Sequence, residues 1–149
     1  EFILIKEYEK LYLDEYVVTP IRARHMKNEN CFIYLIQKGN KSILYANDTG
    51  YLYEDAFEYL LKNKIRLDFV SLDCTMVNNP IKDTEGHMGF DGCNRVALKL
   101  KEMGVVDENT QIYVNHFSHN GNPLQDNLEK IAAPFGLKVS FDGLEIELV

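Results

Sequence analysis

The sequence contains no tryptophan, only three cysteines and four prolines, and no apolar run near the ~20 residues that a membrane span requires. An odd number of cysteines without Cys-x-x-Cys spacing argues against a disulfide-stabilised secreted domain and for a reducing compartment. The first residues have neither a basic segment nor a long apolar stretch, so they do not resemble a signal peptide. We therefore expect a cytoplasmic protein that makes no contact with a membrane.

Basic side chains are in the minority, since 16 lysines and arginines stand against 23 aspartates and glutamates and give a formal charge of −7. This balance provides no general positive field, so nucleic acid is not an expected partner. A negatively charged substrate would need a metal ion or a focused positive pocket. With 46% apolar and 26% charged residues in a chain of 149, we expect residues 1–149 to form a single domain.

The apolar patterns predict an α/β domain that begins with several strands. Short β-branched and aromatic runs predict strands over residues 11–13, 15–21, 31–36 and 42–46, the last two joined in a hairpin. Apolar residues at helical spacing predict helices over residues 53–62, 90–103 and 124–133, which alternate with strands over residues 67–72 and 111–115. Residues 138–148 alternate around Asp142-Gly143, which predicts a closing β-hairpin. A sheet-rich α/β sandwich therefore fits better than a plain doubly wound sheet.

Residues that can bind metals gather at predicted strand ends and in loops. The four histidines all lie in such places: His25, His87, His116 and His119. Asp48 and Asp73 also end predicted strands. Imidazole nitrogens and carboxylate oxygens are ligands of zinc, iron and manganese, and α/β sheets place ligand sites at strand ends. A metal site is one explanation; solvated loop histidines and an Asx-turn or helix cap at Asp48 are the other.

Five segments, taken in chain order, resemble one known family. They are Arg22-Ala-Arg-His25-Met, Leu44-Tyr-Ala-Asn-Asp48-Thr-Gly-Tyr, Leu72-Asp-Cys-Thr75, Gly86-His-Met-Gly89 and Val114-Asn-His116-Phe-Ser-His119. Their order and spacing resemble the second half of the metallo-β-lactamase fold hydrolases, which implies a partial αββα sandwich. Within that superfamily the chain is most similar to the phosphodiesterase branch, which includes the phosphoribosyl cyclic phosphodiesterases of the phosphonate pathway and, more distantly, the tRNA 3′-end-processing endonucleases. The resemblance extends from His25 to the C-terminus.

The resemblance implies a role for each matching residue. His25, Asp48 and His116 match metal ligands, and Asp48 matches the carboxylate that bridges two ions. His87 matches the histidine that contacts the scissile phosphate and protonates the leaving oxygen, a task that suits imidazole because it titrates near neutral pH. His119 resembles an auxiliary histidine that binds the substrate.

Asp73 is interpreted as a residue outside the metal shell that orients a ligand or the Cys74-Thr75 turn, and a simple strand-end cap explains it equally well. The resemblance implies that the complete protein binds two divalent metal ions, zinc or manganese. It also implies hydrolysis of a small phosphodiester, of the cyclic nucleotide or phosphoribosyl type, through metal-activated hydroxide.

One departure from the family is large. Its members carry an upstream His-x-His-x-Asp-His run that supplies most of the metal ligands, and this sequence contains no such run. We therefore interpret residues 1–149 as the C-terminal portion of a hydrolase domain, which by itself binds one ion or none. A half-domain exposes an apolar sheet face, so we expect a homodimer or association with the missing half-domain.

Three alternatives stay open at this point. In the first, the protein is a hydrolase of the same fold that acts on a thioester, lactone or β-lactam instead of a phosphodiester. In the second, the protein is an enzyme that uses Cys74 as a nucleophile beside His87 or His116, although nothing in the sequence indicates a lowered thiol pKa. In the third, the chain is a non-catalytic partner-binding or structural half-domain in which the motif residues are relics.

Overall fold

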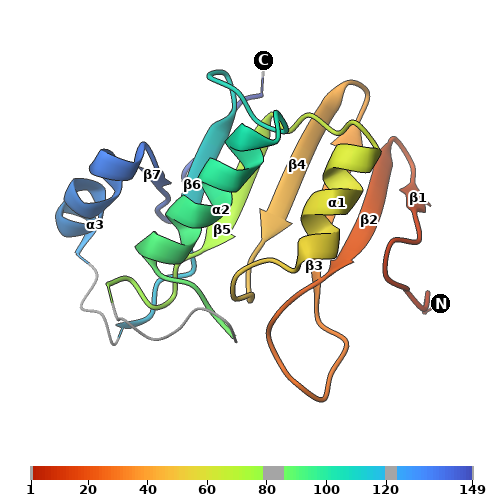
Figure 1. Cartoon of the computed structure of the whole chain (residues 1–149), viewed down its shortest axis with the longest axis horizontal. Helices are drawn as coiled ribbons and strands as arrows, with labels where there is room; N and C mark the ends of the chain where they lie inside the picture. The colour runs from red at the N-terminus through yellow and green to blue at the C-terminus, as the bar shows by residue number, and fades with distance from the viewer. Residues whose placement is uncertain (1, 79–85, 120–123, 149) are drawn as a thin grey trace.

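Seven strands form a single mixed sheet in the computed structural model, which describes residues 2–78, 86–119 and 124–148. Within these residues the strands lie side by side in chain order (Figure 1). They are β1 (Leu11–Leu13), β2 (Tyr16–Arg22), β3 (Phe32–Lys38), β4 (Lys41–Ala46), β5 (Phe69–Asp73), β6 (Gln111–Asn115) and β7 (Lys138–Val139). The strands predicted before the first helix and between the helices are thus confirmed, including the hairpin of β3 and β4.

Strand direction brings several strand ends to one edge of the sheet. Strands β1 to β4 pair antiparallel, whereas β4, β5, β6 and β7 pair parallel. Because β2 and β4 are both antiparallel to β3, β2 points the same way as β4 to β7. The carboxyl ends of these strands therefore meet at one edge, where α/β sheets place their ligand sites. We call it the site edge.

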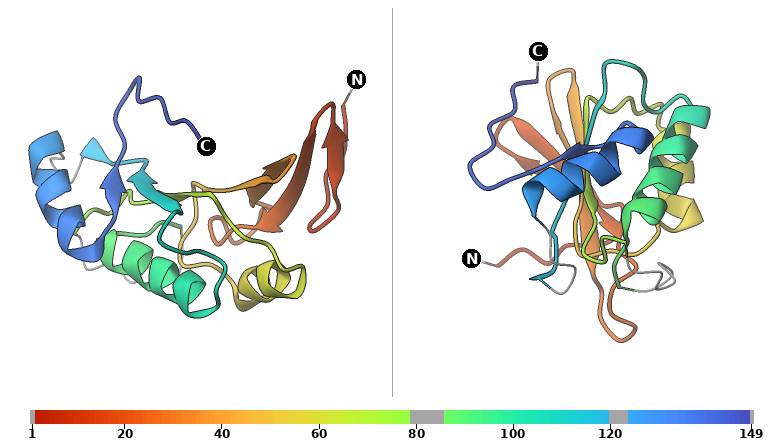
Figure 2. Two further views of the ribbon diagram at one scale, coloured as in Figure 1. Left: turned by 90° about the horizontal axis from the view of Figure 1, so that it is seen from above. Right: turned by 90° about the vertical axis from the view of Figure 1, so that its left-hand side faces the viewer.

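Two helices, α1 (Glu54–Lys62) and α2 (Phe90–Glu102), cover one face of the sheet (Figure 2). The apolar stripe of α1 is buried as its spacing predicts, with Ala56, Phe57 and Leu60 turned inward. Helix α3 (Gln125–Ala132), continued by a 3₁₀ turn (Ala133–Phe135), packs beside β7. All three predicted helices are confirmed. In the described part of the chain, no helix is both long and apolar enough to cross a membrane.

Alternation along the strands divides the sheet into two faces. On the helix-covered face, Leu35, Leu44 and Val70 are paired across β3, β4 and β5 and are completely buried. The rows between them point to the opposite side, where apolar side chains are partly or largely exposed. We call this second surface the open face, and its residues are Val18, Tyr34, Ile36, Ile43, Tyr45, Phe69 and Tyr113.

The C-terminal residues do not form the predicted hairpin, and that prediction is wrong. The turn itself is present, because the Leu144 backbone N–H donates to the Phe141 carbonyl oxygen at 3.1 Å and Gly143 has a φ of 85°. However, β7 is only two residues long and pairs with β6, and residues 144–148 form no strand. A local turn signal thus predicts the reversal of the chain but not the partner of the returning segment.

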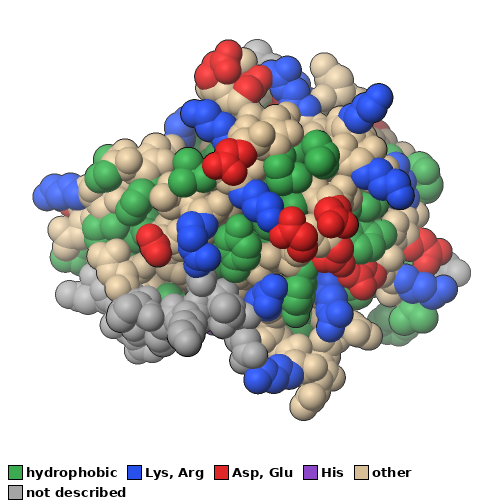
Figure 3. Space-filling model, in the orientation of Figure 1, with side chains coloured by type: hydrophobic (Ala, Val, Ile, Leu, Met, Phe, Trp, Pro, Cys, Tyr) green, Lys and Arg blue, Asp and Glu red, His purple; other side chains and the backbone are tan. Residues whose placement is uncertain are grey.

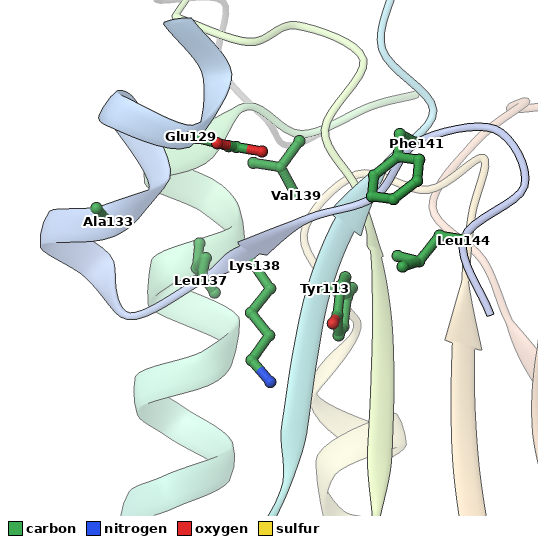
Figure 4. A pocket seen from close by; sticks show the side chains of 8 residues that line it. All are labelled: Tyr113, Glu129, Ala133, Leu137, Lys138, Val139, Phe141 and Leu144. Atoms are coloured by element: carbon green, nitrogen blue, oxygen red, sulfur yellow. The ribbon is translucent and has the colours of Figure 1, made fainter. Parts of the chain in front are cut away.

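The returning segment instead lies over the β6 end of the open face. Gln111 Nε2 donates to the Glu147 carbonyl oxygen at 3.5 Å, and Leu144 lies beside Tyr113 (Figure 4). Together with α3 and β7 this segment borders a pocket of about 270 Å³. Its lining residues are Tyr113, Glu129, Ala133, Leu137, Lys138, Val139, Phe141 and Leu144.

Candidate metal centre

Four side chains with metal-ligand chemistry come together at the site edge. They belong to Asp48 after β4, Asp73 at the end of β5, His87 in the loop before α2 and His116 after β6. Each offers one ligand atom, and these atoms all lie within 4.8 Å of one another. The parallel register explains the convergence, since neighbouring strands of equal direction end side by side.

Asp73 is the buried centre of this group. Its side chain is completely buried, and its carboxylate accepts hydrogen bonds from the Thr49 backbone N–H at 3.1 Å, the Thr75 backbone N–H at 2.9 Å and His87 Nδ1 at 2.8 Å. These donors satisfy the carboxylate without a metal ion. Asp73 therefore connects the loops that follow β4 and β5 and orients the His87 ring.

A threonine hydroxyl orients His116. Thr75 Oγ1 donates to the His116 carbonyl oxygen at 2.9 Å and accepts from His116 Nδ1 at 2.7 Å. The second ring nitrogen, Nε2, is left available and lies 3.4 Å from Asp48 Oδ1. Two ligand atoms of one ion stand about 3 Å apart, because each is about 2 Å from the metal. The spacing of His116 and Asp48 is therefore close to that of a ligand pair.

His25 lies beside the group of four rather than within it. Its ring centre is 4.9 Å from that of His87, and its Nδ1 is 3.1 Å from the Gly86 carbonyl oxygen. Because a carbonyl oxygen only accepts, this contact assigns the proton to Nδ1 and leaves Nε2 unprotonated. His25, His87 and His116 thus each have Nδ1 held by a protein acceptor, the arrangement typical of metal-ligating histidines.

The two facing residues Asp48 and His116 have unfavourable backbone conformations. Their φ angles are 50° and 61°, in the left-handed region, which costs about 1–2 kcal/mol for a residue with a Cβ atom. Such strain is concentrated at functional sites. The two side chains are also accessible, at 56% exposure for Asp48 and 39% for His116, whereas Asp73 is fully buried. Asp48 and His116 are therefore the part of the group that a ligand can reach.

The loop that carries His87 is packed against the turn after β5. The Phe90 backbone N–H donates to the Val77 carbonyl oxygen at 3.0 Å. A Cβ atom at Gly89 would lie only 2.5 Å from that oxygen, so the close approach requires glycine. Gly89 thereby lets the loop come near enough for His87 to reach Asp73.

The structure places the six predicted site residues in three positions. The group of four contains Asp48, Asp73, His87 and His116. His25 is adjacent to it through the His87 ring. His119 is exposed and is not part of the group.

Thr75 is the site residue that sequence reasoning missed. Its hydroxyl lies between two imidazoles, 3.2 Å from His87 Nδ1 and 2.7 Å from His116 Nδ1. The available signal was its place two residues beyond Asp73, a spacing at which an Asp side chain accepts the backbone N–H and turns the chain. Cys74, the alternative nucleophile, is completely buried in the apolar core. Its burial gives a substrate no access to the thiol.

A larger pocket of about 560 Å³ opens beside His116. It is lined by Asn47, Asn115, His116, Phe117, Gln125, Leu128, Ser140, Phe141 and Asp142. Two of these lining residues are connected through the buried Ser71, because Asn115 Nδ2 donates to Ser71 Oγ, which donates to Asn47 Oδ1 at 3.3 Å. Asn115 Oδ1 is buried and has no hydrogen-bond partner among the described residues. An unpaired buried acceptor of this kind marks a place for a donor from a ligand or another segment.

Comparison with known proteins gives matches by structure alone. No protein-family model and no curated protein matches the sequence significantly. The metallo-β-lactamase fold protein YhfI from Bacillus subtilis is 19% identical, with a TM-score of 0.67 over 95% of this chain and 54% of that chain. Zn²⁺-bound PqqB from Methylobacterium extorquens is 18% identical, with a TM-score of 0.68 over 97% and 55%. Human tRNase Z, short form, is 13% identical, with a TM-score of 0.61 over 93% and 46%.

This chain has part of the metallo-β-lactamase fold. The fold prediction is confirmed to that extent. The chain spans about half the length of these three structures, between 46% and 55%. Metal binding recurs among the similar structures, since PqqB is described with Zn²⁺ and CmlA from Streptomyces venezuelae as a diiron β-hydroxylase.

The donor set at the site edge fits a divalent metal ion, but only in part. Carboxylate oxygens and imidazole nitrogens are the right ligands for zinc, iron or manganese. Asp73 and the Nδ1 of His87 are already occupied by their mutual hydrogen bond. Among the described residues that leaves Asp48 and His116, with His25 nearby, which is fewer than the four ligands of one tetrahedral ion.

Proposed function

We propose that the intact protein is a metal-dependent hydrolase that cleaves a small phosphodiester. The observation that carries the proposal is the gathering of His25, His87 and His116 at the site edge, each with Nδ1 bound to a protein acceptor, so that Nε2 takes no part in these hydrogen bonds. The likeness to a tRNase supports the phosphodiester as the substrate class, because an RNase cleaves phosphodiester bonds.

In this proposal Asp48, His116 and His25 would hold the divalent ions, zinc or manganese. Bound ions of this kind supply Lewis acidity and lower the pKa of a bound water. Asp48 suits a ligand that both ions would share, because its carboxylate is accessible and its Oδ1 lies 3.4 Å from His116 Nε2. Three residues cannot fill the shells of two ions, so further ligands would come from outside the described residues.

His87, as the imidazolium with a proton on each ring nitrogen, is proposed to deliver the Nε2 proton to the leaving oxygen and to remain as the neutral ring with its proton on Nδ1. Its Nδ1 bond to the buried Asp73 carboxylate fixes the ring and its tautomer, as a general acid requires. Asp73 acts through His87 and does not touch the substrate. His119, exposed beyond His116, is proposed to bind a part of the substrate farther from the ions.

The open face is proposed to pack against the other half of the fold. Its partly exposed Ile36, Ile43 and Phe69 form an apolar row across three strands. Such a surface is typical of a sheet that is covered on both sides. The buried, unpaired Asn115 Oδ1 would accept a hydrogen bond from that half. A second copy of this chain is the alternative occupant, which would make a homodimer.

The test compares metal content and hydrolysis of bis(p-nitrophenyl) phosphate in the intact gene product and its variants. Asp48→Asn should lose bound metal by elemental analysis and lose activity with it. His87→Ala should keep its metal and lower kcat by roughly 10²–10⁴. Asp91→Asn, an exposed carboxylate in the first turn of α2, is the matched control and should change neither quantity.

Each contrary outcome has a definite meaning. Loss of metal in His87→Ala would make His87 a ligand instead of an acid. If the protein hydrolysed a thioester or lactone but not the diester, it would still be a metal-dependent hydrolase. The phosphodiester would then be the wrong substrate class. A well-folded, metal-free and inactive intact protein would overturn the hydrolase and favour a non-catalytic binding domain.

A further inference from the structure

A pair of arginines stands at the site edge and has no role in the proposed metal centre. Arg22 ends β2, and Arg24 directly precedes His25. Their guanidinium carbons lie 5.3 Å and 4.0 Å from the centre of the Tyr53 ring. Two guanidinium groups thus lie near the same aromatic ring. This local positive charge contrasts with the formal charge of −7 of the whole chain.

These two charges have no acidic partner among the described residues. Arg24 Nε donates to the Tyr51 carbonyl oxygen at 2.8 Å, which leaves its charge unbalanced. Other basic side chains of the described segments do meet carboxylates, such as Lys41 with Asp68 at 3.3 Å. Because like charges repel, two neighbouring unpaired guanidinium groups are unfavourable unless an anion lies between or beside them.

We propose that Arg22, Arg24 and Tyr53 form a subsite for a phosphate group that the substrate carries in addition to its scissile diester. A terminal phosphate has a charge of about −1.5 to −2 and three acceptor oxygens, enough to engage two guanidinium groups. The planar donors of arginine match phosphate oxygens in pairs. Stacking on Tyr53 orients both groups before the ligand arrives.

Backbone contacts tie this subsite to the proposed metal centre. The Arg24 carbonyl oxygen accepts from the Gly50 N–H at 2.8 Å and from the Gly86 N–H at 3.0 Å. Gly50 belongs to the loop of Asp48, and Gly86 to the loop of His87. The Arg24 backbone is therefore tied to the loops that carry the reacting groups, as a subsite for a second group of one substrate requires. This inference rests on the proposed function for the second phosphate, but phosphate binding itself does not depend on hydrolysis.

The first experiment measures binding of inorganic phosphate to the intact gene product by calorimetry, with metals removed by a chelator. Arg22→Gln should weaken binding by at least about tenfold, because it removes charge-assisted hydrogen bonds. Lys62→Gln changes the charge equally on an exposed lysine in the last turn of α1 and should bind as the wild type. Acetate, which has a single charge, should not compete at equal concentration.

The role of the ring is tested at the same time. Tyr53→Phe keeps the aromatic face and should retain phosphate binding, whereas Tyr53→Leu removes it and should weaken binding several-fold. Circular dichroism checks that each variant is folded. If Tyr53→Phe and Tyr53→Leu lost phosphate affinity equally, the Tyr53 hydroxyl and not its aromatic face would be required. That result would overturn the proposed stacking of the arginines on Tyr53.

The second experiment compares thymidine 5′-(p-nitrophenyl phosphate) with the same diester carrying a 3′-phosphate. The wild type should have the lower KM for the phosphorylated diester, and Arg22→Gln should bring the ratio of the two KM values close to one. An unchanged ratio together with unchanged phosphate binding would overturn the subsite while leaving the hydrolase intact. Phosphate binding that depends on Arg22 in a protein that cleaves neither diester would keep the anion site and remove the proposed function.

Discussion

The two faces of the sheet are built from the same strands and end in different surroundings. On the helix-covered face, Leu44 is completely buried, while its neighbour Tyr45 on the open face is 44% exposed. The surface over α1 and α2 carries interspersed acidic and basic side chains (Figure 3). The open face presents apolar and aromatic side chains instead. Strand alternation created two apolar faces, and this chain covers only one of them with helices.

This difference indicates how the site is built. A sheet that is apolar on both sides belongs in the middle of a layered fold, where each face packs against another layer. The site edge, with Asp48, Asp73 and His116, is then the line along which the two layers meet. Residues on this edge would receive ligands or donors from both layers, as the proposed metal site requires.

Replacing Leu44 or Tyr45 with alanine is the strongest test of the contrast. In the chain of residues 1–149, Leu44→Ala should lower the free energy of unfolding by about 2–5 kcal/mol, because it leaves a cavity in the core. Tyr45→Ala should lower it by less than about 1 kcal/mol, since the ring is largely exposed. Urea denaturation followed by circular dichroism measures both.

The same pair in the intact gene product sharpens the comparison. If the other half of the fold covers the open face, the cost of Tyr45→Ala should rise toward that of Leu44→Ala. A small cost in both proteins would mean that the open face stays exposed and that no further layer packs there.

A charge on the open face should reduce self-association of this chain. Ile36→Lys places an ammonium group in the apolar row and should raise the dimer dissociation constant at least about tenfold, or about 1.4 kcal/mol. Leu98→Lys is the control, because Leu98 lies on α2 and is 51% exposed. Sedimentation velocity and binding of a hydrophobic dye are the measurements. A monodisperse wild-type chain that binds no dye would show that the open face does not drive association.

The smallest effect concerns the C-terminal segment that partly covers the open face. Gly143 has a φ of 85°, so Gly143→Ala should cost about 1 kcal/mol of stability. Dye binding should rise as the segment after the turn detaches from Tyr113. Glu145→Ala, an exposed position in the same segment, should leave both quantities unchanged. Equal behaviour of the two variants would mean that the turn does not hold the segment in place.

The two predicted hairpins show where sequence reasoning works and where it fails. Residues 31–36 and 42–46 form β3 and β4 as predicted, because both strands have a partner next to them in the chain and a buried face that sets the register. The C-terminal hairpin had an equally good turn signal at Asp142-Gly143. Its second strand did not form; Leu144 lies beside Tyr113, and the Glu147 carbonyl oxygen accepts from Gln111 instead.

The candidate site divides in the same way. Asp48, Asp73 and His116 could be selected in advance, because carboxylates and imidazoles at strand ends are visible in the pattern. The contact of Asp73 with His87, and the threonine hydroxyl between His87 and His116, could not. These contacts depend on loops that follow different strands, so no local pattern encodes them.

The sequence by itself determined the strands and helices before the C-terminal turn, the placement of histidines and carboxylates at strand ends, and the absence of an upstream His-x-His-x-Asp-His run. Periodicity and residue type are local properties, so they can be read along the chain. Only the tertiary structure decided which strand ends meet, which nitrogen of each imidazole is available and which face of the sheet lies open. These outcomes depend on strand register and on packing between residues far apart in the chain, and those contacts form only when the whole sheet assembles.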